Sequence, residues 1–490
     1  MLTAVIVGAG FSGLAAAIQL KNAGIQDFVI LEKADRVGGT WRENTYPGAA
    51  CDVPSHLYSY SFEPNPSWSR AYGGQAEILA YLEHCADKYN LRPHLKFGQH
   101  VDSARFDEAT GSWHVATAAG ERLEARALLL GNGALHLPAL PDIPGLETFR
   151  GRRFHSAQWD HGYDLTGKRV AVIGTGASAI QFVPQIAPKV AHLDVYQRTA
   201  PWVVPKRDRT ITDAERWFYA HVPATHWLRR AGLYWLMESR VVGFAFAPKV
   251  NEVLESLARL YLKKAVHDPA LRAKLTPTYR FGCKRVLISN DWYPALQREN
   301  VDVVTDRIEA ITPRGVRTAD GTEREVDALI LGTGFRVNEY LSAIRITGRG
   351  GIDLNDEWRK SLRNYLGISV SGFPNLFLLM GPNTGLGHNS MIFMIEAQAR
   401  YAANALCELR DRNLAFLDVL PSAEQAFRAE LAAKMKNTVW TTGCQSWYQT
   451  PDGDVFLWPG ATFDYWWRTR SVPLHAYEMR AVPRPMRRAA

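Results

Sequence analysis

The chain has 490 residues, a length that predicts roughly three domains. Hydrophobic residues make up 47% of the sequence, which supports sizeable cores and excludes a disordered chain. The net charge of +8 comes from scattered lysines and arginines that form no long basic block, so we expect no nucleic-acid partner.

The N-terminal segment has the pattern of a dinucleotide-binding unit. An apolar strand over residues 3–7 leads into Gly8-x-Gly10-x-x-Gly13, followed by a helix over 14–20 and a strand over 28–31 that ends in Glu32. In such a unit the first two glycines let the backbone turn and approach a pyrophosphate, and the third lets the helix pack on the strand. Glu32 is placed to accept the ribose hydroxyls, which predicts an adenine dinucleotide with a free 2′-hydroxyl.

A glycine- and proline-rich segment over residues 38–52 follows, which predicts a loop. Trp41, Tyr46 and Asp52 in this loop could line a flat ring beside the nucleotide, or Trp41 could simply pack in the core of a turn-rich connection. A hairpin is expected over 101–117, and an apolar strand over 127–130 returns to the first sheet.

A second unit repeats this plan. A strand over 169–173 precedes Gly174-x-Gly176-x-x-Ala179, a helix over 180–186 despite Pro184, and a strand over 192–196. Glu32 and Arg198 each lie 24 residues after the first glycine of their turn. A guanidinium suits a 2′-phosphate, so the second site should bind NADPH. A hairpin-like stretch over 301–318 and a strand over 328–331 close this unit.

Three further segments lie outside these two patterns. The aromatic stretch over 206–277 predicts helices that could wall a substrate cavity, and the glycine-rich loop 380–391 leads into a helix over 392–403. That loop could hold the polar edge of a cofactor or serve only as a helix cap. Between the two glycine turns, His155 and Trp159 either couple the two sites or pack in a surface connector.

The cysteines and histidines exclude several kinds of chemistry. Five cysteines show no Cys-x-x-Cys or zinc spacing, and their odd number without a signal peptide predicts a cytoplasmic protein. No metal is expected, because the histidines do not cluster with carboxylates at ligand spacing. The apolar region 232–247 is too short to span a bilayer. NADPH delivers a hydride, for which FAD is the expected acceptor. Cys51 stands alone in its loop, which argues against a disulfide reductase.

Two signatures in the chain resemble those of the type I Baeyer–Villiger monooxygenases, a group of class B flavoprotein monooxygenases. The first is Phe149-x-Gly151-x-x-x-His155-x-x-x-Trp159-Asp160, and the second is Gly38-Gly-x-Trp41-x-x-x-x-Tyr46-Pro-Gly48-x-x-x-Asp52. The resemblance implies an α/β fold with two nested Rossmann-like dinucleotide-binding domains of the glutathione-reductase type. FAD would bind to residues 1–145 with 335–490, NADPH to 150–205 with 277–334, and residues 206–276 would form a helical insertion.

The resemblance also implies roles for individual residues. His155 would act at the domain junction during cofactor movement, together with Phe149, Gly151 and Trp159. The FAD site would comprise Gly8, Gly10, Gly13, Glu32, Thr40, Trp41, Asp52, Tyr58, Val101 and Met391. The NADPH site would comprise Thr175, Gly176, Ala177, Ser178, Ala179, Gln181, Arg198, Thr199, Lys284, Arg285 and Trp447.

Arg285 is the expected catalytic residue, with Asp52 as the partner that holds it. The implied reaction converts a ketone to an ester or lactone with NADPH and O2 through a C4a-peroxyflavin. A fixed guanidinium stays protonated, favours the anionic peroxide and stabilises charge on the tetrahedral adduct. The alternative interpretation is that Lys284 and Arg285 are an ordinary pair of basic side chains in solvent. Two other functions remain open at this point: an N- or S-oxygenating flavin-containing monooxygenase, and a non-catalytic nucleotide-binding redox sensor.

Overall fold

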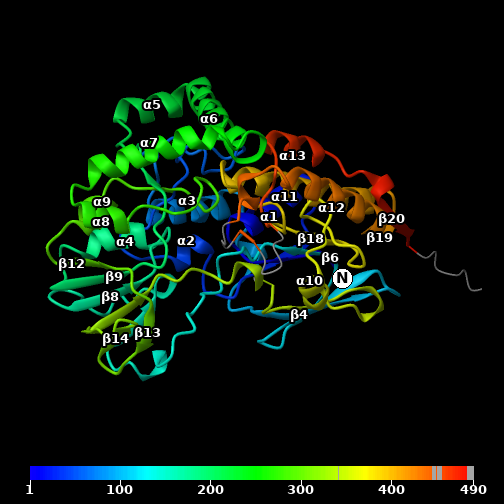
Figure 1. Cartoon of the computed structure of the whole chain (residues 1–490). Helices are drawn as coiled ribbons and strands as arrows, with labels where there is room; N and C mark the ends of the chain where they lie inside the picture. The colour runs from blue at the N-terminus through cyan, green and yellow to red at the C-terminus, as the bar shows by residue number, and fades with distance from the viewer. Residues whose placement is uncertain (340, 444–447, 450–454, 483–490) are drawn as a thin grey trace, which may run out of the picture.

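A computed structural model describes residues 1–339, 341–443, 448–449 and 455–482. Two α/β units lie side by side, the first on the right in Figure 1 and the second on the left. Helices from the middle of the chain cover the top of the second unit, and C-terminal helices cover the first. No helix among the described residues is long and apolar enough to cross a membrane.

The first unit is built on a sheet of eight strands within the described chain, in the order β17-β4-β5-β6-β1-β2-β3, with β18 beside β6. Its central strands are buried on both faces, because Ala4 and Ile6 point into one core and Val5 and Val7 into another. The hairpin expected over 101–117 and the returning strand over 127–130 are both confirmed. The strands are β1 (Leu2–Val7), β2 (Phe28–Leu31), β3 (Leu95–Lys96), β4 (Val101–Asp107), β5 (Ser112–Thr117), β6 (Arg122–Leu130), β17 (Arg345–Thr347) and β18 (Leu376–Leu378).

Helices from both ends of the chain pack on one face of this sheet. The glycine turn leads into α1, whose small side chains, Ala15 to Ala17, let it lie against α11. Ser390 caps α11 by accepting a hydrogen bond from the backbone of Ile392 at 3.3 Å, so the helix expected over 392–403 is confirmed and is longer. The helices of this unit are α1 (Phe11–Asn22), α3 (Gln75–Lys88), α10 (Leu354–Lys360), α11 (Met391–Asp411), α12 (Pro421–Met435) and α13 (Thr462–Arg468), and the hairpin β19 (Leu414–Val419) with β20 (Tyr477–Ala481) lies beside them.

The second unit contains a parallel sheet in the order β12-β9-β8-β16-β7. The strands expected at 169–173, 192–196 and 328–331 are confirmed, as is the helix that contains Pro184. The hairpin expected over 301–318 is wrong in its first part. Residues 301–304 form an edge strand parallel to β9, and only the strands after them form antiparallel pairs. The elements are β7 (Arg152–His155), β8 (Arg169–Ile173), α4 (Ala179–Ile186), β9 (His192–Tyr196), α9 (Trp292–Leu296), β12 (Val301–Val304), β13 (Ile308–Ile311), β14 (Gly315–Thr318), β15 (Glu323–Glu325) and β16 (Ala328–Leu331).

The reason for this difference is the burial of residues 301–304. Val301 and Val303 belong to the core of the second unit, which they reach only by adding to the edge of its parallel sheet. The helix α9 before them supplies the crossover that a parallel strand requires. Alternating apolar residues indicate a strand, but they do not say which strand is the partner.

The middle of the chain is helical, as expected. Thr212 and Glu215 form a capping box that begins the first of these helices. The short pair β10 (Val203–Val204) and β11 (Leu287–Ile288) lies where the helical segment leaves and rejoins the second unit. The helices are α5 (Asp213–His221), α6 (Pro223–Glu238), the π-helix η4 (Val242–Phe246), α7 (Val250–Ala265) and α8 (Pro269–Lys274).

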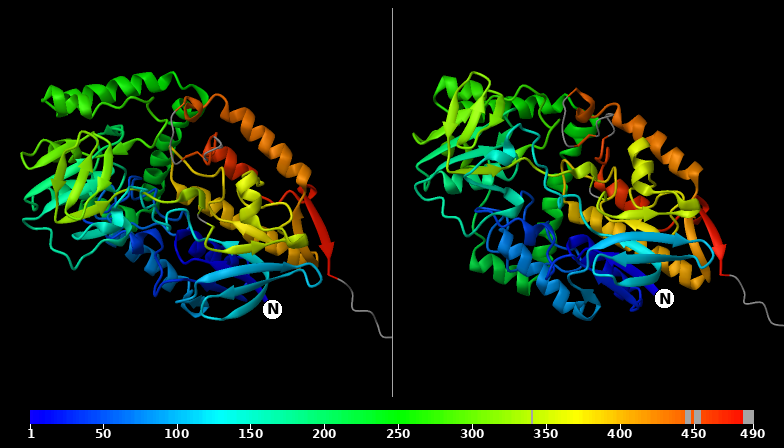
Figure 2. Two further views of the ribbon diagram at one scale, coloured as in Figure 1. Left: turned by 60° about the horizontal axis from the view of Figure 1, so that its bottom comes forward. Right: turned by 90° about the horizontal axis from the view of Figure 1, so that it is seen from below.

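The chain passes between the two units twice, and the two connections run antiparallel. Pro138 and Phe335 form a β-bridge, the amide of Ala139 donates to the carbonyl of Gly334 at 2.9 Å, and that of Arg336 to Leu137 at 2.9 Å. Figure 2 shows the two units joined at this junction from two further sides. The second unit is therefore nested within the sequence of the first.

Candidate active site

Two glycines of the first turn, Gly8 and Gly13, have no room for a side chain. Gly8 has a φ of 92°, and a Cβ on Gly13 would lie 1.8 Å from the carbonyl oxygen of Gly8. The N-cap of α1 is Gly10, and no side chain caps the helix, so its first N–H groups are left for a ligand. Gly10 and Gly39 approach each other so closely that a Cβ on Gly39 would lie 3.1 Å from the Cα of Gly10. This cradle fits a pyrophosphate.

Glu32 lies beside this turn and is buried. Its carboxylate accepts hydrogen bonds from the amides of Ala9 at 2.8 Å and Ala34 at 3.0 Å, and it pairs with Arg42 at 3.2 Å. The acid therefore lies beside the first glycine turn, and its role in binding a ribose stays a prediction. The loop expected over residues 38–52 differs in one respect, because Thr40 begins a single helical turn, α2 (Thr40–Glu43). The glycines before it allow this turn, since both have a positive φ.

The loop over residues 46–52 is held by the second unit through Gln181 of α4. The side-chain oxygen of Gln181 accepts from the hydroxyl of Tyr46 at 3.0 Å and from the amide of Ala50 at 3.3 Å. Its nitrogen donates to the carbonyl of Ala50 at 2.9 Å. Gly48 must be a glycine here, because a Cβ would lie 2.9 Å from the backbone oxygen of Gln181. Gln181 thus joins the two units, a role that the sequence did not indicate.

The second glycine turn repeats the first. Gly174 has a φ of 111°, and a Cβ on it would lie 2.4 Å from the carbonyl oxygen of Gly332. Thr175 donates from its hydroxyl to the carbonyl of Thr199 at 3.4 Å, which connects the turn to the end of β9. No side chain caps α4, which starts at Ala179. Gly176 and Ala177 are exposed, so the turn is open to a ligand.

Arg198 and Lys284 form a positive cluster beside this second turn. Burial lowers the pKa of Lys284, and repulsion from Arg198 lowers it further. The Lys284 ammonium also lies 4.8 Å from the ring centre of Tyr279. Two cations close enough to repel each other suit an anion such as a 2′-phosphate.

Arg285 and Asp52 form a bidentate ion pair across the two units. Nε of Arg285 donates to Oδ2 of Asp52 at 2.9 Å, and a terminal nitrogen donates to Oδ1 at 2.7 Å. The Asp52 carboxylate raises the pKa of Arg285 above its ordinary value. The Arg285 side chain remains 36% exposed, so it is anchored without being covered. This geometry contradicts the interpretation of Lys284-Arg285 as a freely solvated pair.

Other side chains around this ion pair were not predicted. Burial raises the pKa of Tyr448 to about 12, and Arg285 and Asp52 both act on it electrostatically. Burial lowers the pKa of Arg240. Tyr72 and Asp52 lie close enough to Arg240 to offset part of this decrease. These residues come from separate segments, so no local spacing could have indicated them.

Trp41 is buried in the core of the first unit, as the packing alternative expected, and the hypothesis that it lines a flat ring stays a prediction. The indole nitrogen of Trp41 donates to the hydroxyl of Tyr58 at 3.1 Å, and Phe11 packs edge-on against Tyr58. Burial raises the pKa of the nearby Cys51 thiol, so this cysteine is a poor nucleophile.

His155 and Trp159 occupy different surroundings at the junction. His155 is buried at the end of β7, its Nδ1 accepts from the amide of Ala157 at 3.1 Å, and its ring packs edge-on against Phe335. Burial lowers the pKa of His155. Trp159 instead packs against Phe154 and Phe182 in the core of the second unit.

The remaining predicted residues vary in how well the structure locates them. Gly151 is required, since a Cβ would lie 2.5 Å from the carbonyl oxygen of Asp327, and Phe149 packs against the core beside β16. Val101 is buried at the start of β4, and Met391 begins α11. Trp447 lies outside the described residues.

A cluster of one histidine and two aspartates is relevant to the expectation that the protein binds no metal. Nε2 of His192 lies 3.5 Å from Asp194 and 3.4 Å from Asp302, and Arg324 lies 3.6 Å from Asp194. His192 and Asp194 belong to β9, Asp302 to β12 and Arg324 to β15. The ligand atoms of His192, Asp194 and Asp302 all lie within 4.8 Å of one another, so the expectation of no metal stays a prediction.

Several known proteins are similar to this chain. The model of the pyridine nucleotide-disulphide oxidoreductase family matches residues 5–212. A Baeyer–Villiger monooxygenase of Pseudomonas aeruginosa is 49% identical over 481 residues, which cover 98% of this chain and 91% of the relative. One of Streptomyces coelicolor is 48% identical over 477 residues, 97% of this chain and 92% of the relative.

Solved structures agree. A steroid monooxygenase bound to NADP matches with a TM-score of 0.89 and 32% identity, over 98% of this chain and 100% of that chain. The enzyme called OTEMO, in complex with FAD and NADP, matches with a TM-score of 0.89 and 27% identity, over 98% and 99%.

Two nested dinucleotide folds, with a guanidinium fixed where their loops meet, define an NADPH-dependent flavoprotein monooxygenase. Within that class, the chain belongs to the Baeyer–Villiger monooxygenase family. Both sequence signatures had indicated this family, and the structural matches confirm the fold expected from them.

Proposed function

We propose that this protein uses NADPH and O2 to insert an oxygen atom beside a ketone carbonyl, which gives an ester or lactone. The single observation that carries the proposal is the Arg285–Asp52 pair. It lies where a loop of the first unit, held by Gln181, meets the segment that carries Lys284. A fixed positive charge therefore lies between the two predicted nucleotide sites.

We assign FAD to residues 1–145 with 335–490, and NADPH to 150–205 with 277–334. The glycine cradle at Gly8–Gly13 and the buried Glu32 support the first assignment. The uncapped start of α4 and the repulsion between Arg198 and Lys284 support the second. Bound FAD would accept a hydride from NADPH and activate O2.

Arg285 has two tasks in this proposal. Because Asp52 raises its pKa, the guanidinium stays protonated and favours an anionic oxygen nucleophile over its protonated form. It then stabilises the negative charge that develops on the carbonyl oxygen of the ketone. Asp52 acts as a positioning residue, because two hydrogen bonds in a fork fix the plane of the guanidinium.

The buried surroundings help to exclude water. Cys51, next to Asp52 in the sequence, is buried, and Tyr448 is buried beside Arg285. A site with few water molecules strengthens the effect of a fixed charge and limits the loss of reactive oxygen as peroxide. Nicotinamide dinucleotide that stays in its site after hydride transfer would add to this exclusion.

The test is a panel of ketones supplied to the FAD-loaded enzyme, with NADPH consumption and product mass both measured. We expect the yellow protein to bleach with NADPH and to yield products heavier than the ketone by one oxygen atom. A thioether offered together with each ketone separates the proposal from an enzyme that oxygenates only sulfur or nitrogen. Protein that does not bleach with NADPH would instead indicate a redox sensor.

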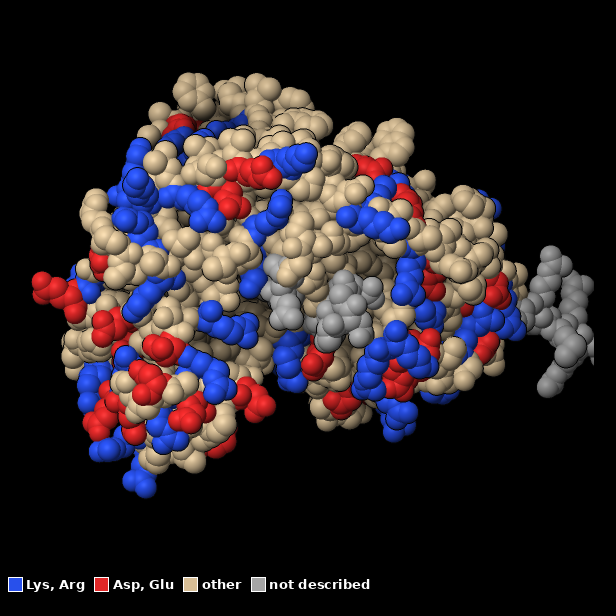
Figure 3. All heavy atoms as spheres, viewed as in Figure 1, with Lys and Arg blue, Asp and Glu red and all other residues tan. Residues whose placement is uncertain are grey.

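The setting of the reaction is also proposed. A small molecule and O2 are the partners that the family implies, and we propose a ketone as the small molecule. Lysines and arginines are interspersed with acidic residues over the face shown in Figure 3, so we propose no nucleic-acid partner. A cytoplasmic location remains a prediction from the cysteine pattern.

A further inference from the structure

The surface formed by α6 and α13 is unusually rich in exposed apolar side chains. Trp227 is 68% exposed, Leu228 60% and Trp235 59% on α6, while Trp467 is 59% exposed on α13. The side chains of Leu236 and Phe463 extend this surface, which we call the tryptophan face. Soluble proteins rarely expose such a group of large side chains without a partner.

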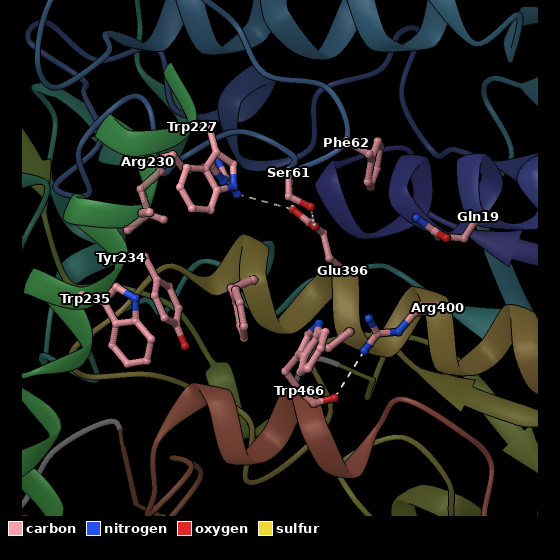
Figure 4. A pocket seen from close by; sticks show the side chains of 14 residues that line it. Gln19, Ser61, Phe62, Trp227, Arg230, Tyr234, Trp235, Glu396, Arg400 and Trp466 are labelled. Atoms are coloured by element: carbon pink, nitrogen blue, oxygen red, sulfur yellow. Dashed lines mark hydrogen bonds and ion pairs between the residues drawn. The ribbon is translucent and has the colours of Figure 1, made fainter. Parts of the chain in front are cut away.

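The two helices belong to one surface because they line the same pocket. Its volume is about 300 Å³. Trp227 and Trp235 reach it from α6 and Trp466 from α13, as Figure 4 shows. The hydroxyls of Tyr234 and Thr462 lie 3.0 Å apart and tie the helices together. The tryptophan face is therefore a fixed part of the fold.

The unpaired charge on this face is positive, because Asp464 of α13 is 41% exposed but pairs with Arg468 at 3.1 Å and with Lys434 at 3.6 Å. Arg229 is exposed on α6, and the single acid of that helix, Glu238, is buried, where it accepts from Asn389 at 2.7 Å. Arg470, just beyond α13, lies over the rings of Trp466 and Trp467 at 5.1 and 4.7 Å. Tryptophan flanked by arginine is the composition of segments that lie at the interface between water and lipid.

The floor of the pocket also carries a positive charge. Glu396 accepts from the backbone and hydroxyl of Ser61 and lies 3.7 Å from Arg230. Arg400 also lines the pocket, and its Nε is buried without a hydrogen-bond partner. Two guanidinium groups thus face one carboxylate, which leaves a net positive charge beneath the aromatic rim.

We propose that the tryptophan face binds the surface of an anionic lipid bilayer, with α6 and α13 lying in its plane. The aromatic and leucine side chains would enter the boundary between head groups and acyl chains, while Arg229 and Arg470 meet the phosphates. No helix need cross the membrane for this. The inference goes beyond the proposed reaction and does not depend on a ketone substrate.

Flotation of the FAD-loaded full chain with lipid vesicles tests the proposal. One set of vesicles contains phosphatidylcholine alone, and the other contains phosphatidylcholine with phosphatidylglycerol. We expect the protein to float with the anionic vesicles, and high salt to weaken this binding because part of it is electrostatic. Protein that stays at the bottom with both sets would overturn the proposal.

A matched pair of variants locates the binding surface. Trp227→Gln with Trp235→Gln should lower vesicle binding by at least about tenfold, because two large side chains no longer leave water. Met479→Gln removes a side chain that is 47% exposed on β20, elsewhere in the fold, and should bind like the parent. The flavin spectrum and NADPH oxidation without vesicles verify that each variant is folded.

Two results would contradict the assignment. Equal vesicle binding by the double variant and the parent would place the lipid contact elsewhere. In the second, the parent protein sediments as a dimer and does not bind vesicles, while the double variant sediments as a monomer. This result would mean that a second copy of this chain covers the tryptophan face.

Discussion

At the scale of single residues, Arg285 decides what the site can do. Arg285→Ala should leave flavin reduction by NADPH measurable, while ester formation falls by roughly 10²–10³-fold, because a fixed donor to developing negative charge is lost. Anaerobic bleaching of the flavin and product analysis in air measure the two steps separately. Arg468→Ala is a suitable control, since Arg468 makes a similar fork with Glu430 far from the site. Undiminished ester formation in Arg285→Ala would remove Arg285 from the mechanism.

Arg198 should set the preference for NADPH over NADH. Arg198→Ala should raise the KM for NADPH by roughly 10–100-fold and leave that for NADH nearly unchanged, because only NADPH carries the 2′-phosphate that the guanidinium binds. Steady-state kinetics with both nucleotides measure this. Arg314→Ala, on the β13–β14 hairpin of the same unit, controls for a general loss of positive charge. An unchanged preference would show that the phosphate lies elsewhere.

The residues that the sequence revealed are those set by local spacing. Glu32 and Arg198 follow from their distance to a glycine turn, and the structure places both beside their turns. Arg285 and Asp52 are 233 positions apart, and only their resemblance to family positions paired them. Neither a local spacing nor a family position indicated Arg240 and Tyr448, since tertiary folding alone brings them to the ion pair.

At the scale of elements, one glycine of the first turn should matter for folding and another for cofactor binding. A Cβ on Gly13 would lie 1.8 Å from the carbonyl oxygen of Gly8, whereas one on Gly10 would lie 3.4 Å from its nearest atom. Gly13→Ala should therefore destabilise the apoprotein by at least about 3 kcal/mol. Gly10→Ala should fold normally but lose FAD, because a methyl group would narrow the cradle between Gly10 and Gly39 in which we propose that the pyrophosphate binds.

Thermal unfolding of both apoproteins and their flavin content after purification measure this difference. Gly176→Ala serves as the matched variant in the second turn, where a Cβ would meet no atom within 4 Å. It should keep its flavin and weaken only NADPH binding. Equal stability of the Gly13→Ala and Gly10→Ala apoproteins would contradict the steric argument.

Strands and helices could be predicted where the hydrophobic periodicity of the sequence was strong. Which strands pair with each other could not be predicted from that periodicity. The buried strands beside each glycine turn follow from short apolar runs, and the structure has them at the expected places. The sequence predicts a hairpin-like stretch over 301–318, yet the burial of residues 301–304 requires β9 as their partner. Likewise, glycines suggested a loop at 38–43, where positive φ angles permit a helical turn at Thr40.

At the scale of the whole molecule, Gln181 holds the two units in register. Gln181→Ala removes three hydrogen bonds to the loop that carries Asp52, worth roughly 0.5–1.5 kcal/mol each. We expect NADPH still to reduce the flavin, but a larger share of the oxygen to leave as hydrogen peroxide, because Arg285 is held less firmly. The ratio of peroxide formed to NADPH consumed measures this coupling.

Gln185→Ala is the control for this variant. Gln185 lies one turn further along α4 with its side chain beside Gly48, but it makes none of these three hydrogen bonds, so its loss leaves the loop anchored. The expectation fails if both variants release the same share of peroxide as the parent enzyme.

The nesting of one unit inside the other has a consequence for the order of synthesis. A ribosome releases β1 and α1 early, but α11, which packs on α1, and β18, which pairs with β6, emerge only after the second unit is complete. The nascent protein therefore carries a finished second unit beside an uncovered first unit. We expect FAD to be captured late, once the last third of the polypeptide has left the exit tunnel.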